Sequence, residues 1–530
     1  MTTRETERPD ARRSIRPGRP QGVLLSSLID LFGLTTAAGR PAHQGGVRLT
    51  GATLDSRDVR PGDLYLALSG ARSHGAQFCL EAERKGAAAV LTDATGVELL
   101  SDTALGVPVL VAGQDPRSIA GAVAASIYGT DDFDAKLFGV TGTNGKTSVV
   151  YLLAALMRAA GLKEGLSSTA ERRVGEEAIP SSLTSPEAPE LHGLLARMKE
   201  AGVQGVALEV SAHATSRHRV DGVHFDVVGF NNFSRDHLDD FGDMESYFAA
   251  KLALFSPDHA ARGVVVVDTP YGQRIAKQSQ IPVTTLATEY GVEADWHLAV
   301  TRQDLDGVGF VVQGPAGAHF RGSVPLFGRF MAENAALALI MLHEAGVHVD
   351  RISASLDHGR IPVYIPGRLE AMNPTAPLSR APRFYVDYGH TPGSFEATLD
   401  ALAEVAPARV LFMFGADGDR DTEKREEMGR IAASGSDVVI ICDYHPRNED
   451  PAAIRAQLIA GARSANHAEV LECADPREAI RLAISLARPG DVILYAGPGH
   501  EDFQEIAGRQ YAYSAREEVR GALREVGMLQ

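Results

Sequence analysis

The sequence predicts an α/β protein built from three domains. Short apolar, strand-like runs alternate with helical stretches along most of the chain. A length of 530 residues exceeds what one hydrophobic core normally organises and favours about three domains. A glycine-rich turn at residues 139–148 joins a predicted strand to a predicted helix, an arrangement typical of parallel sheets that bind phosphate groups.

The overall composition narrows the class of function. The chain is 44% hydrophobic and 23% charged, as in soluble globular proteins, and no apolar run is long enough to span a bilayer. The formal net charge of −16 argues against a general nucleic-acid or membrane-surface binder. Cys79, Cys442 and Cys473 have neither metal-ligand nor disulfide spacing, so we expect a cytoplasmic protein.

The N-terminal region divides into a tail and a first domain. Residues 1–21 are rich in arginine and proline without an apolar segment, so we expect a disordered tail. Residues 22–133 mix short strands and helices and form the first, small α/β domain. Its expected helices are 24–32 and 76–85, and its expected strands are 63–68, 87–92 and 107–111.

The central domain, residues 134–366, contains the glycine-rich turn and is expected to be a parallel-sheet domain like that of P-loop ATPases. Main-chain N–H groups of such a turn converge on an anion, Lys146 would reach the terminal phosphates of a nucleotide, and the Thr147 hydroxyl would lie on Mg²⁺. Gly139 lies six residues before Gly145, one more than the common spacing. The alternative is a glycine-rich turn that happens to precede a lysine. A strand, the glycines, Lys-Thr and a helix follow one another in the order of a phosphate loop, which favours the binding of ATP.

Further polar groups follow the central strands. Expected strands lie at 205–210, 225–230, 263–268 and 308–312, with a helix at 330–344. Glu209 ends one strand, where a carboxylate beside a phosphate loop suits Mg²⁺; the alternative is a glutamate that faces water. Residues 231–239 place cationic, carboxylate and imidazole groups in one loop, which is typical of ligand contact or of a solvated loop.

Lys251 lies within an apolar helical stripe. The stripe consists of Met244, Tyr247, Phe248, Leu252 and Phe255. A snorkelling lysine is the common explanation for such a position. The alternative is a desolvated amine whose neutral, reactive form is favoured.

The third domain, residues 367–530, repeats the alternation and is expected to be Rossmann-like. Its expected strands are 384–387, 410–414, 438–441 and 492–495, with helices such as 394–405 and 451–464. Loops after these strands bring Arg420, Arg447 and Glu501 to one sheet edge. Two guanidinium groups suit a substrate carboxylate and Glu501 suits an amino group, unless the charges form a surface network.

These motifs together resemble the Mur ligase family, and within it the branch that adds the third amino acid of the peptidoglycan stem peptide. The resemblance covers roughly residues 48–525 in order. It is carried by the stretch at 53–64, Gly-Thr-Asn-Gly-Lys-Thr at 142–147, Ser-Arg-Asp-His-Leu-Asp at 234–239, Pro-Gly-Arg-Leu-Glu at 366–370, Asp-Tyr-Gly-His-Thr-Pro at 387–392 and Gly-Asp-Arg-Asp at 418–421.

The resemblance implies a monomeric, ATP- and Mg²⁺-dependent ligase that joins an amino acid, meso-diaminopimelate or a related diamino acid, to UDP-N-acetylmuramoyl-L-Ala-D-Glu through an acyl phosphate. Implied catalytic residues are Lys146, His237 and a carbamylated Lys251. Implied magnesium ligands are Thr147, Glu209, His237 and Lys251. Implied ATP-binding residues are Gly142, Thr143, Asn144, Gly145, Lys146, Thr147, Ser148, Asn334, Arg368 and Asp387.

The resemblance also implies two substrate pockets, and makes the first domain the UDP-binding domain. UDP-substrate positions are Leu54, Ser56, Ala71, Arg72, Ser73, Thr184, Ser185, Ser211, Arg217 and Arg219. Amino-acid positions are Arg420, Tyr444, His445, Arg447, Gly497 and Glu501.

The acceptor pocket departs from the family pattern. Tyr444-His445-Pro446-Arg447 stands where the family has Asp-Asn-Pro-Arg, and Pro498 replaces a lysine in Gly-Lys-Gly-His-Glu. A paralogue of specialised metabolism that joins a different amine to a different carboxylate is therefore an alternative. Another alternative is a folate-type ligase, against which the presence of the first domain argues. A further alternative is a non-catalytic nucleotide-binding protein, and the evidence against it is the retention of Lys146, Glu209, His237 and Lys251.

Overall fold

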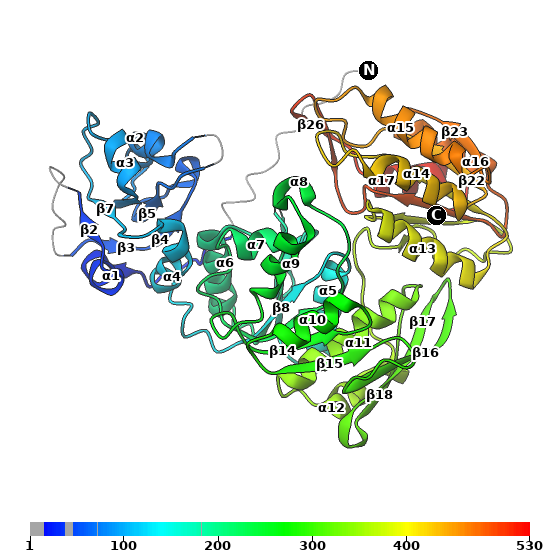
Figure 1. Ribbon diagram of the computed structural model, residues 1–530, viewed down its shortest axis with the longest axis horizontal. Helices are drawn as coiled ribbons and strands as arrows, with labels where there is room; N and C mark the ends of the chain where they lie inside the picture. Colours follow the sequence, from blue (N-terminus) through cyan, green and yellow to red (C-terminus); the bar gives the residue numbers. More distant parts are fainter. Residues whose placement is uncertain (1–14, 38–45, 71–72, 182, 530) are drawn as a thin grey trace.

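The computed structural model describes residues 15–37, 46–70, 73–181 and 183–529 and confirms the predicted α/β class (Figure 1). Three large sheets follow one another along the chain, each with helices packed on it. The first sheet lies at the left of Figure 1, the central sheet in the middle, and the third at the upper right. Within these ranges, no helix combines the length and the hydropathy that crossing a bilayer requires.

The first domain contains a five-stranded sheet in the order β2-β7-β6-β5-β4, parallel except for β2. The predicted helix at 76–85 splits into a 3₁₀ turn, η3 (Gly75–Phe78), and α2. The elements are β1 (Val23–Leu24), α1 (Leu25–Phe32), β2 (Thr35–Thr36), β3 (Arg48–Leu49), β4 (Gly51–Thr53), η2 (Ser56–Asp58), β5 (Asp63–Leu66), α2 (Cys79–Arg84), β6 (Ala89–Thr92), α3 (Ala94–Leu99), β7 (Val109–Val111) and α4 (Pro116–Tyr128).

The central sheet has 11 strands among the described residues, in the order β11-β10-β9-β12-β8-β13-β14-β15-β16-β17-β18. Strands β9 to β16 in this order are parallel, and antiparallel strands extend both edges. Phe138 and Val140 of β8 pack with α5 and α11 on one face, whereas Leu137 packs with α6, α9 and α10 on the other. Helices on both faces explain why the central strands are apolar throughout.

The strands of this domain are β8 (Lys136–Thr141), β9 (Glu164–Ser167), β10 (Glu171–Val174), β11 (Glu177–Pro180), β12 (Gly205–Glu209), β13 (Phe225–Phe230), β14 (Ala260–Val266), β15 (Val283–Ala287), β16 (Trp296–Asp304), β17 (Gly307–Gln313) and β18 (His319–Val324). The helices are α5 (Lys146–Ala159), α6 (Ala188–Glu200), α7 (Ala212–Ser216), α8 (Leu238–Phe241), α9 (Met244–Leu252), α10 (Pro270–Gln278), η4 (Pro315–Gly317), α11 (Arg329–Glu344), α12 (Val349–Ser355) and η5 (Asp357–Gly359).

The third domain has a six-stranded sheet in the order β19-β20-β24-β21-β22-β23, parallel except for β19. Its first helix begins with a capping box between Thr391 and Ser394, and a proline at the first helical turn. The elements are β19 (Glu370–Ala371), β20 (Arg383–Asp387), α13 (Pro392–Val405), β21 (Val410–Phe414), α14 (Lys424–Ser434), β22 (Val438–Ile441), α15 (Pro451–Ser464), β23 (Glu469–Glu472), α16 (Pro476–Leu486), β24 (Val492–Ala496), β25 (Phe503–Ile506), β26 (Arg509–Ala512) and α17 (Ala515–Glu525).

Residues 15–21 differ from the expected disordered tail. The Ile15 side chain is 3% exposed and packs in the hydrophobic cluster of the central domain. Arg16 forms an ion pair of 2.6 Å with Asp63 of the first domain, and the Gly18 N–H donates to Glu200 of α6 at 2.7 Å. An isoleucine among polar residues is too weak a local signal to predict this docking. The remainder of the predicted tail, residues 1–14, lies outside the described residues.

Candidate functional site

The phosphate loop lies at the carboxyl end of β8 and leads into α5. It contains Gly142, Thr143, Asn144, Gly145, Lys146, Thr147 and Ser148. Asn144 is held from both sides, because its N–H donates to Asn232 Oδ1 at 2.8 Å and its carbonyl accepts from Asn231 Nδ2 at 3.1 Å. Asn231 also donates to Asn334 Oδ1 at 2.7 Å, which brings the predicted Asn334 against the loop. Neither Asn231 nor Asn232 was predicted as a site residue, although both lie in the polar loop that follows β13.

Gly145 requires glycine for two reasons. Its φ is +85°, a region that side chains disfavour, and a Cβ there would lie 2.1 Å from Asn231 Nδ2. The main chain can therefore turn into α5 with its N–H groups exposed to an anion.

Two lysines share one carbonyl of this loop. Lys146 Nζ donates to Gly142 O at 2.9 Å and to Thr143 O at 2.8 Å, and Lys251 Nζ donates to the same Gly142 O at 2.8 Å. Lys251 is 1% exposed, and its Nζ lies 4.4 Å from the centre of the Tyr247 ring. Burial, reinforced by the charge of Lys146, lowers the pKa of Lys251 well below that of an ordinary lysine. The amine is therefore buried and does not snorkel to the solvent, and its burial disfavours the charged form.

Glu209 is the buried carboxylate at the end of β12. Its two oxygens accept from the Thr169 N–H at 2.9 Å and the Thr169 hydroxyl at 3.1 Å. Thr184 Oγ1 lies 3.1 Å from the same hydroxyl, Ser185 Oγ donates to Glu209 O at 2.8 Å, and the Ser211 N–H donates to Ser185 Oγ at 3.1 Å. Three residues predicted for the UDP substrate thus lie around the predicted magnesium ligand.

His237 lies next to two groups that sequence reasoning missed. Donor atoms of His213, His237 and Asp240 all lie within 4.8 Å of one another, an arrangement that could hold a cation. Burial lowers the pKa of His237 to about 4, which leaves a neutral imidazole for metal ligation. Of the predicted arginines, Arg217 pairs with Asp240 at 3.5 Å, whereas Arg219 pairs with Glu187 at 2.8 Å.

The third domain reaches the phosphate loop through Arg368. Its Nη2 donates to Thr147 Oγ1 at 3.1 Å, and its guanidinium lies 4.3 Å over the Tyr388 ring. Asp387 is fixed by the N–H groups of Leu369 at 2.9 Å and Gly389 at 2.7 Å. The predicted nucleotide residues therefore come from two domains and meet at one place.

A hollow of about 540 Å³ lies between the first and central domains. Leu54 lines it, together with Ile15 and Arg16, which were not predicted as site residues because they fall in the expected tail. Among the described members of the predicted UDP-substrate set, only Leu54 lines this hollow. The Ser56 hydroxyl instead donates to Glu81 at 2.6 Å. The other described members that do not line the hollow are Ser73, Thr184, Ser185, Ser211, Arg217 and Arg219. Ala71 and Arg72 lie outside the described residues.

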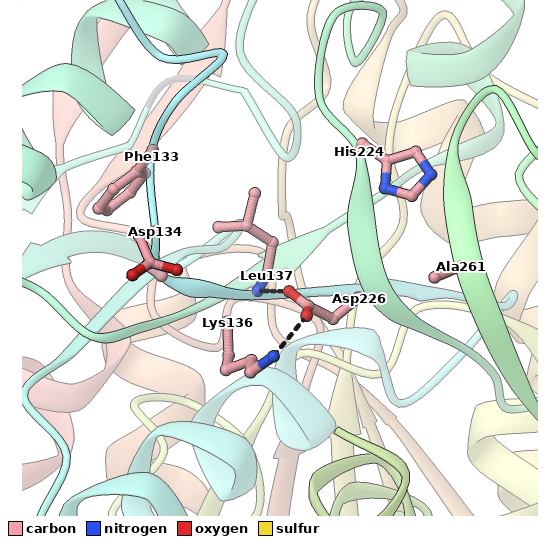
Figure 2. Close-up of a pocket in the computed structure, with 8 residues that line it drawn as sticks. Phe133, Asp134, Lys136, Leu137, His224, Asp226 and Ala261 are labelled. Carbon is pink, nitrogen blue, oxygen red and sulfur yellow. Dashed lines mark hydrogen bonds and ion pairs between the residues drawn. The ribbon is translucent and has the colours of Figure 1, made fainter. Parts of the chain in front are cut away.

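A second hollow of about 240 Å³ lies at the opposite, amino end of β8 and β13 (Figure 2). There Asp226 accepts from Lys136 Nζ at 2.9 Å and from the Leu137 N–H at 2.8 Å. Since ligands of parallel sheets bind at the carboxyl ends of strands, this hollow is not the candidate site.

The predicted amino-acid residues gather at the carboxyl edge of the third sheet. Glu501 Oε2 accepts from the Tyr444 hydroxyl and from His445 Nε2, the latter at 2.7 Å. Burial alone would raise the pKa of Glu501, but the hydrogen bond from His445, the charge interaction with His445 and the hydrogen bond from Tyr444 together outweigh it and lower the pKa. The Gly497 N–H donates to Asp387 O at 3.0 Å, which connects this pocket to the nucleotide residues.

Two arginines border this pocket and differ in exposure and in their ion pairs. Arg420 is half exposed and lies 3.6 Å from Asp239 of the central domain. Arg447 is mostly buried and pairs with Asp417 at 3.1 Å and Glu505 at 3.2 Å. Asp417 and Glu505 were not predicted from the sequence.

Comparisons with known proteins agree with this geometry. Residues 48–122 match the Mur ligase family catalytic domain, residues 140–342 the Mur ligase middle domain, and residues 367–499 the Mur ligase glutamate ligase domain. The chain is 54% identical to a UDP-N-acetylmuramyl-tripeptide synthetase of Leifsonia xyli subsp. xyli, with 97% of this chain and 99% of that protein covered.

Two further similarities span nearly the whole chain. A UDP-N-acetylmuramoyl-L-alanyl-D-glutamate–2,6-diaminopimelate ligase of Streptomyces coelicolor is 42% identical, with 96% of this chain and 99% of that protein covered. A solved structure of a ligase of that name is 27% identical, with a TM-score of 0.63 and coverage of 96% of this chain and 99% of that one. The chain therefore belongs to the Mur ligase family.

Proposed function

We propose that this chain adds an amino acid, meso-diaminopimelate or a related diamino acid, to UDP-N-acetylmuramoyl-L-Ala-D-Glu during synthesis of peptidoglycan precursors. Mur ligases are ADP-forming amide ligases that use ATP and Mg²⁺. The observation that carries the proposal is the 3.1 Å contact between Arg368 and Thr147, which joins the acceptor domain to the phosphate loop. The similarity to Mur ligases extends over the first domain as well. It therefore argues against a paralogue that joins an amine to a different carboxylate.

The reaction has two balanced steps. A carboxylate oxygen of the muramoyl dipeptide attacks the γ-phosphorus of ATP, and ADP leaves from an acyl phosphate. The amine of the acceptor then attacks the acyl carbon, phosphate leaves, and the amine loses a proton. Lys146 would stabilise charge on the transferring phosphoryl group, and Arg368 and Asn334 would orient the nucleotide.

The residues of the site fit Mg²⁺. Thr147 offers a hydroxyl and Glu209 a buried carboxylate, which are the oxygen donors that a hard cation prefers. The neutral imidazole of His237 adds a group that could position an ion. When bound, magnesium would supply positive charge where phosphoryl oxygens become more negative. The muramoyl peptide would lie against Thr184, Ser185 and Ser211, and the UDP group in the hollow that Leu54 lines.

We infer that Lys251 carries a carbamate in the active enzyme. Its neutral amine would attack CO₂, forming an N–C bond and releasing one proton. The resulting anion would lie beside Lys146 and offer oxygen ligands to a cation. Support comes from the shared Gly142 carbonyl, because two ammonium groups at one oxygen repel each other.

The enzyme is inferred to act in the cytoplasm, where ATP and UDP-sugars are available, and as a monomer, because one chain supplies every side chain named above. Phosphate release is measured with ATP, Mg²⁺, UDP-N-acetylmuramoyl-L-Ala-D-Glu and a panel of diamino acids, with mass spectrometry of the product. We expect amide formation with at least one of them. ATP binding without turnover across the panel would refute the proposed function.

A further inference from the structure

The main chain of Arg447 is held in an unfavourable conformation. Its φ is +49°, which is uncommon for a residue with a side chain. The Arg447 N–H donates to Glu505 O at 3.1 Å, and the Ala507 N–H donates to Arg447 O at 2.7 Å. These two bonds pair the loop with the β25–β26 hairpin, so the hairpin fixes where the Arg447 side chain begins.

The guanidinium of Arg447 is occupied at all three nitrogens. Nε lies 3.2 Å from Glu505 Oε2, Nη1 donates to Gly418 O at 3.1 Å, and Nη2 lies 3.1 Å from Asp417 Oδ1. A carboxylate that binds an arginine in the bidentate mode uses two nitrogens on one edge of the guanidinium. Both such edges of Arg447 already carry protein oxygens, so a second carboxylate of an acceptor would have to displace Asp417 or Glu505.

The pocket around Arg447 has surplus negative charge. The Glu505 N–H donates to His445 Nδ1 at 2.8 Å, so Nδ1 is the acceptor and the hydrogen lies on Nε2, which donates to Glu501. Arg447 is paired with two carboxylates, Asp417 and Glu505, and Glu501 beyond them is bound to His445 and to tyrosine hydroxyls. This surplus of carboxylates suits an ammonium group.

Aromatic rings limit the space beyond Glu501. Tyr444 is 6% exposed and His445 is 3% exposed, and His445 stacks on Phe503 with ring centres 5.1 Å apart. The Tyr388 hydroxyl lies 3.4 Å from the other oxygen of Glu501. Arg420, by contrast, is half exposed and its ion pair with Asp239 is long, at 3.6 Å, so it can receive one carboxylate.

We propose that the acceptor is an L-diamino acid with a single carboxylate, of the lysine, ornithine and 2,4-diaminobutyrate class, bound by its carboxylate to Arg420 and by its side-chain ammonium to Glu501 and Asp417. A second carboxylate, as in meso-diaminopimelate, is rejected by Asp417 and Glu505. This inference rests on the proposed function. The α-amine forms the new C–N bond, the bond from the acyl carbon to phosphate breaks, and one proton is released.

The test compares kcat/KM among acceptors on the full chain with ATP, Mg²⁺ and UDP-N-acetylmuramoyl-L-Ala-D-Glu. We expect one of L-lysine, L-ornithine and L-2,4-diaminobutyrate to exceed meso-diaminopimelate by at least about tenfold, since a carboxylate that must break an existing ion pair loses one charge-assisted contact. Equal or faster turnover of meso-diaminopimelate would overturn the inference.

Calorimetry separates this inference from the proposed function. Each amino acid is titrated into the enzyme with ADP and Mg²⁺. Tighter binding of a single-carboxylate diamino acid supports the inference even if no acyl substrate turns over, and tighter binding of meso-diaminopimelate overturns it. Absence of turnover with all acceptors counts against the acyl substrate and thus against the proposed function.

A pair of substitutions tests the role of the ion pairs. Asp417→Asn with Glu505→Gln frees Arg447, and we expect the ratio of meso-diaminopimelate to single-carboxylate turnover to rise by about tenfold. The matched control is Glu525→Gln, which breaks an arginine–glutamate pair of 2.7 Å with Arg481 on the surface of the same domain and should leave the ratio unchanged. If the double variant is unfolded at the assay temperature, Glu505→Gln alone serves. An unchanged ratio in a folded variant would overturn the inference.

Discussion

Lys251→Met separates the chemistry of the buried amine from its packing. Methionine retains the apolar stem against Tyr247 and has a similar volume, so the free energy of unfolding should change by less than about 1.5 kcal/mol. If the carbamate stabilises the transferring phosphoryl group, its loss should cost about 3–4 kcal/mol in the transition state, or roughly 100–1000-fold in kcat. Nucleotide binding should persist, because the phosphate loop is also held by Asn231 and Asn232.

The assay is phosphate release at saturating substrates, combined with thermal unfolding and titration of ADP. Lys277→Met on α10 is the matched control, because Lys277 is exposed and the variant should retain activity. Wild-type enzyme in CO₂-depleted buffer should lose activity and regain it on addition of bicarbonate. A folded Lys251→Met variant within about threefold of wild-type kcat, or activity independent of CO₂, would refute the carbamate and leave Lys251 as a structural residue.

Three further predictions follow from single contacts. Gly145→Ala would place a Cβ 2.1 Å from Asn231 Nδ2, and we expect a titration to show ADP binding weakened roughly tenfold or more. Gly346→Ala is the control, because Gly346 has a similar φ but faces open space, and it should not weaken ADP binding. Arg368→Lys loses the 3.1 Å hydrogen bond to the phosphate-loop threonine and the stacking on a tyrosine ring. We expect KM for ATP to rise about tenfold while KM for the UDP substrate stays constant. Equal changes in both KM values would contradict the placement of Arg368 at the nucleotide. Burial lowers the pKa of His192 from 6.5 to about 4. Between these pH values the unfolded chain binds more protons than the folded one, so the free energy of unfolding falls by about 3 kcal/mol as the pH drops through them. Urea titrations should show this pH dependence in the wild type and its absence in His192→Gln.

Much of the fold was predictable because its signals are local. The expected strand at 205–210 corresponds to β12, and the expected helix at 330–344 corresponds to α11, since an apolar run or a helical period involves neighbouring residues only. Strands β9, β10 and β11 were not predicted, because they are short, β10 and β11 carry many polar side chains, and β11 lies at the sheet edge. Edge strands bury one face at most, so their sequence pattern is weak.

The sequence by itself determined the phosphate loop, the polar groups at the strand ends and the resemblance to Mur ligases, because these depend on residue type and short spacing. Only the tertiary structure decided which groups meet. It brings Lys251 to the carbonyl of Gly142, 109 residues away, and His445 to Glu501, 56 residues away. It also shows that Arg447 is already paired with Asp417 and Glu505. Whether a charge is free or paired depends on distances between strands and loops far apart in the chain, and a local pattern does not contain those distances.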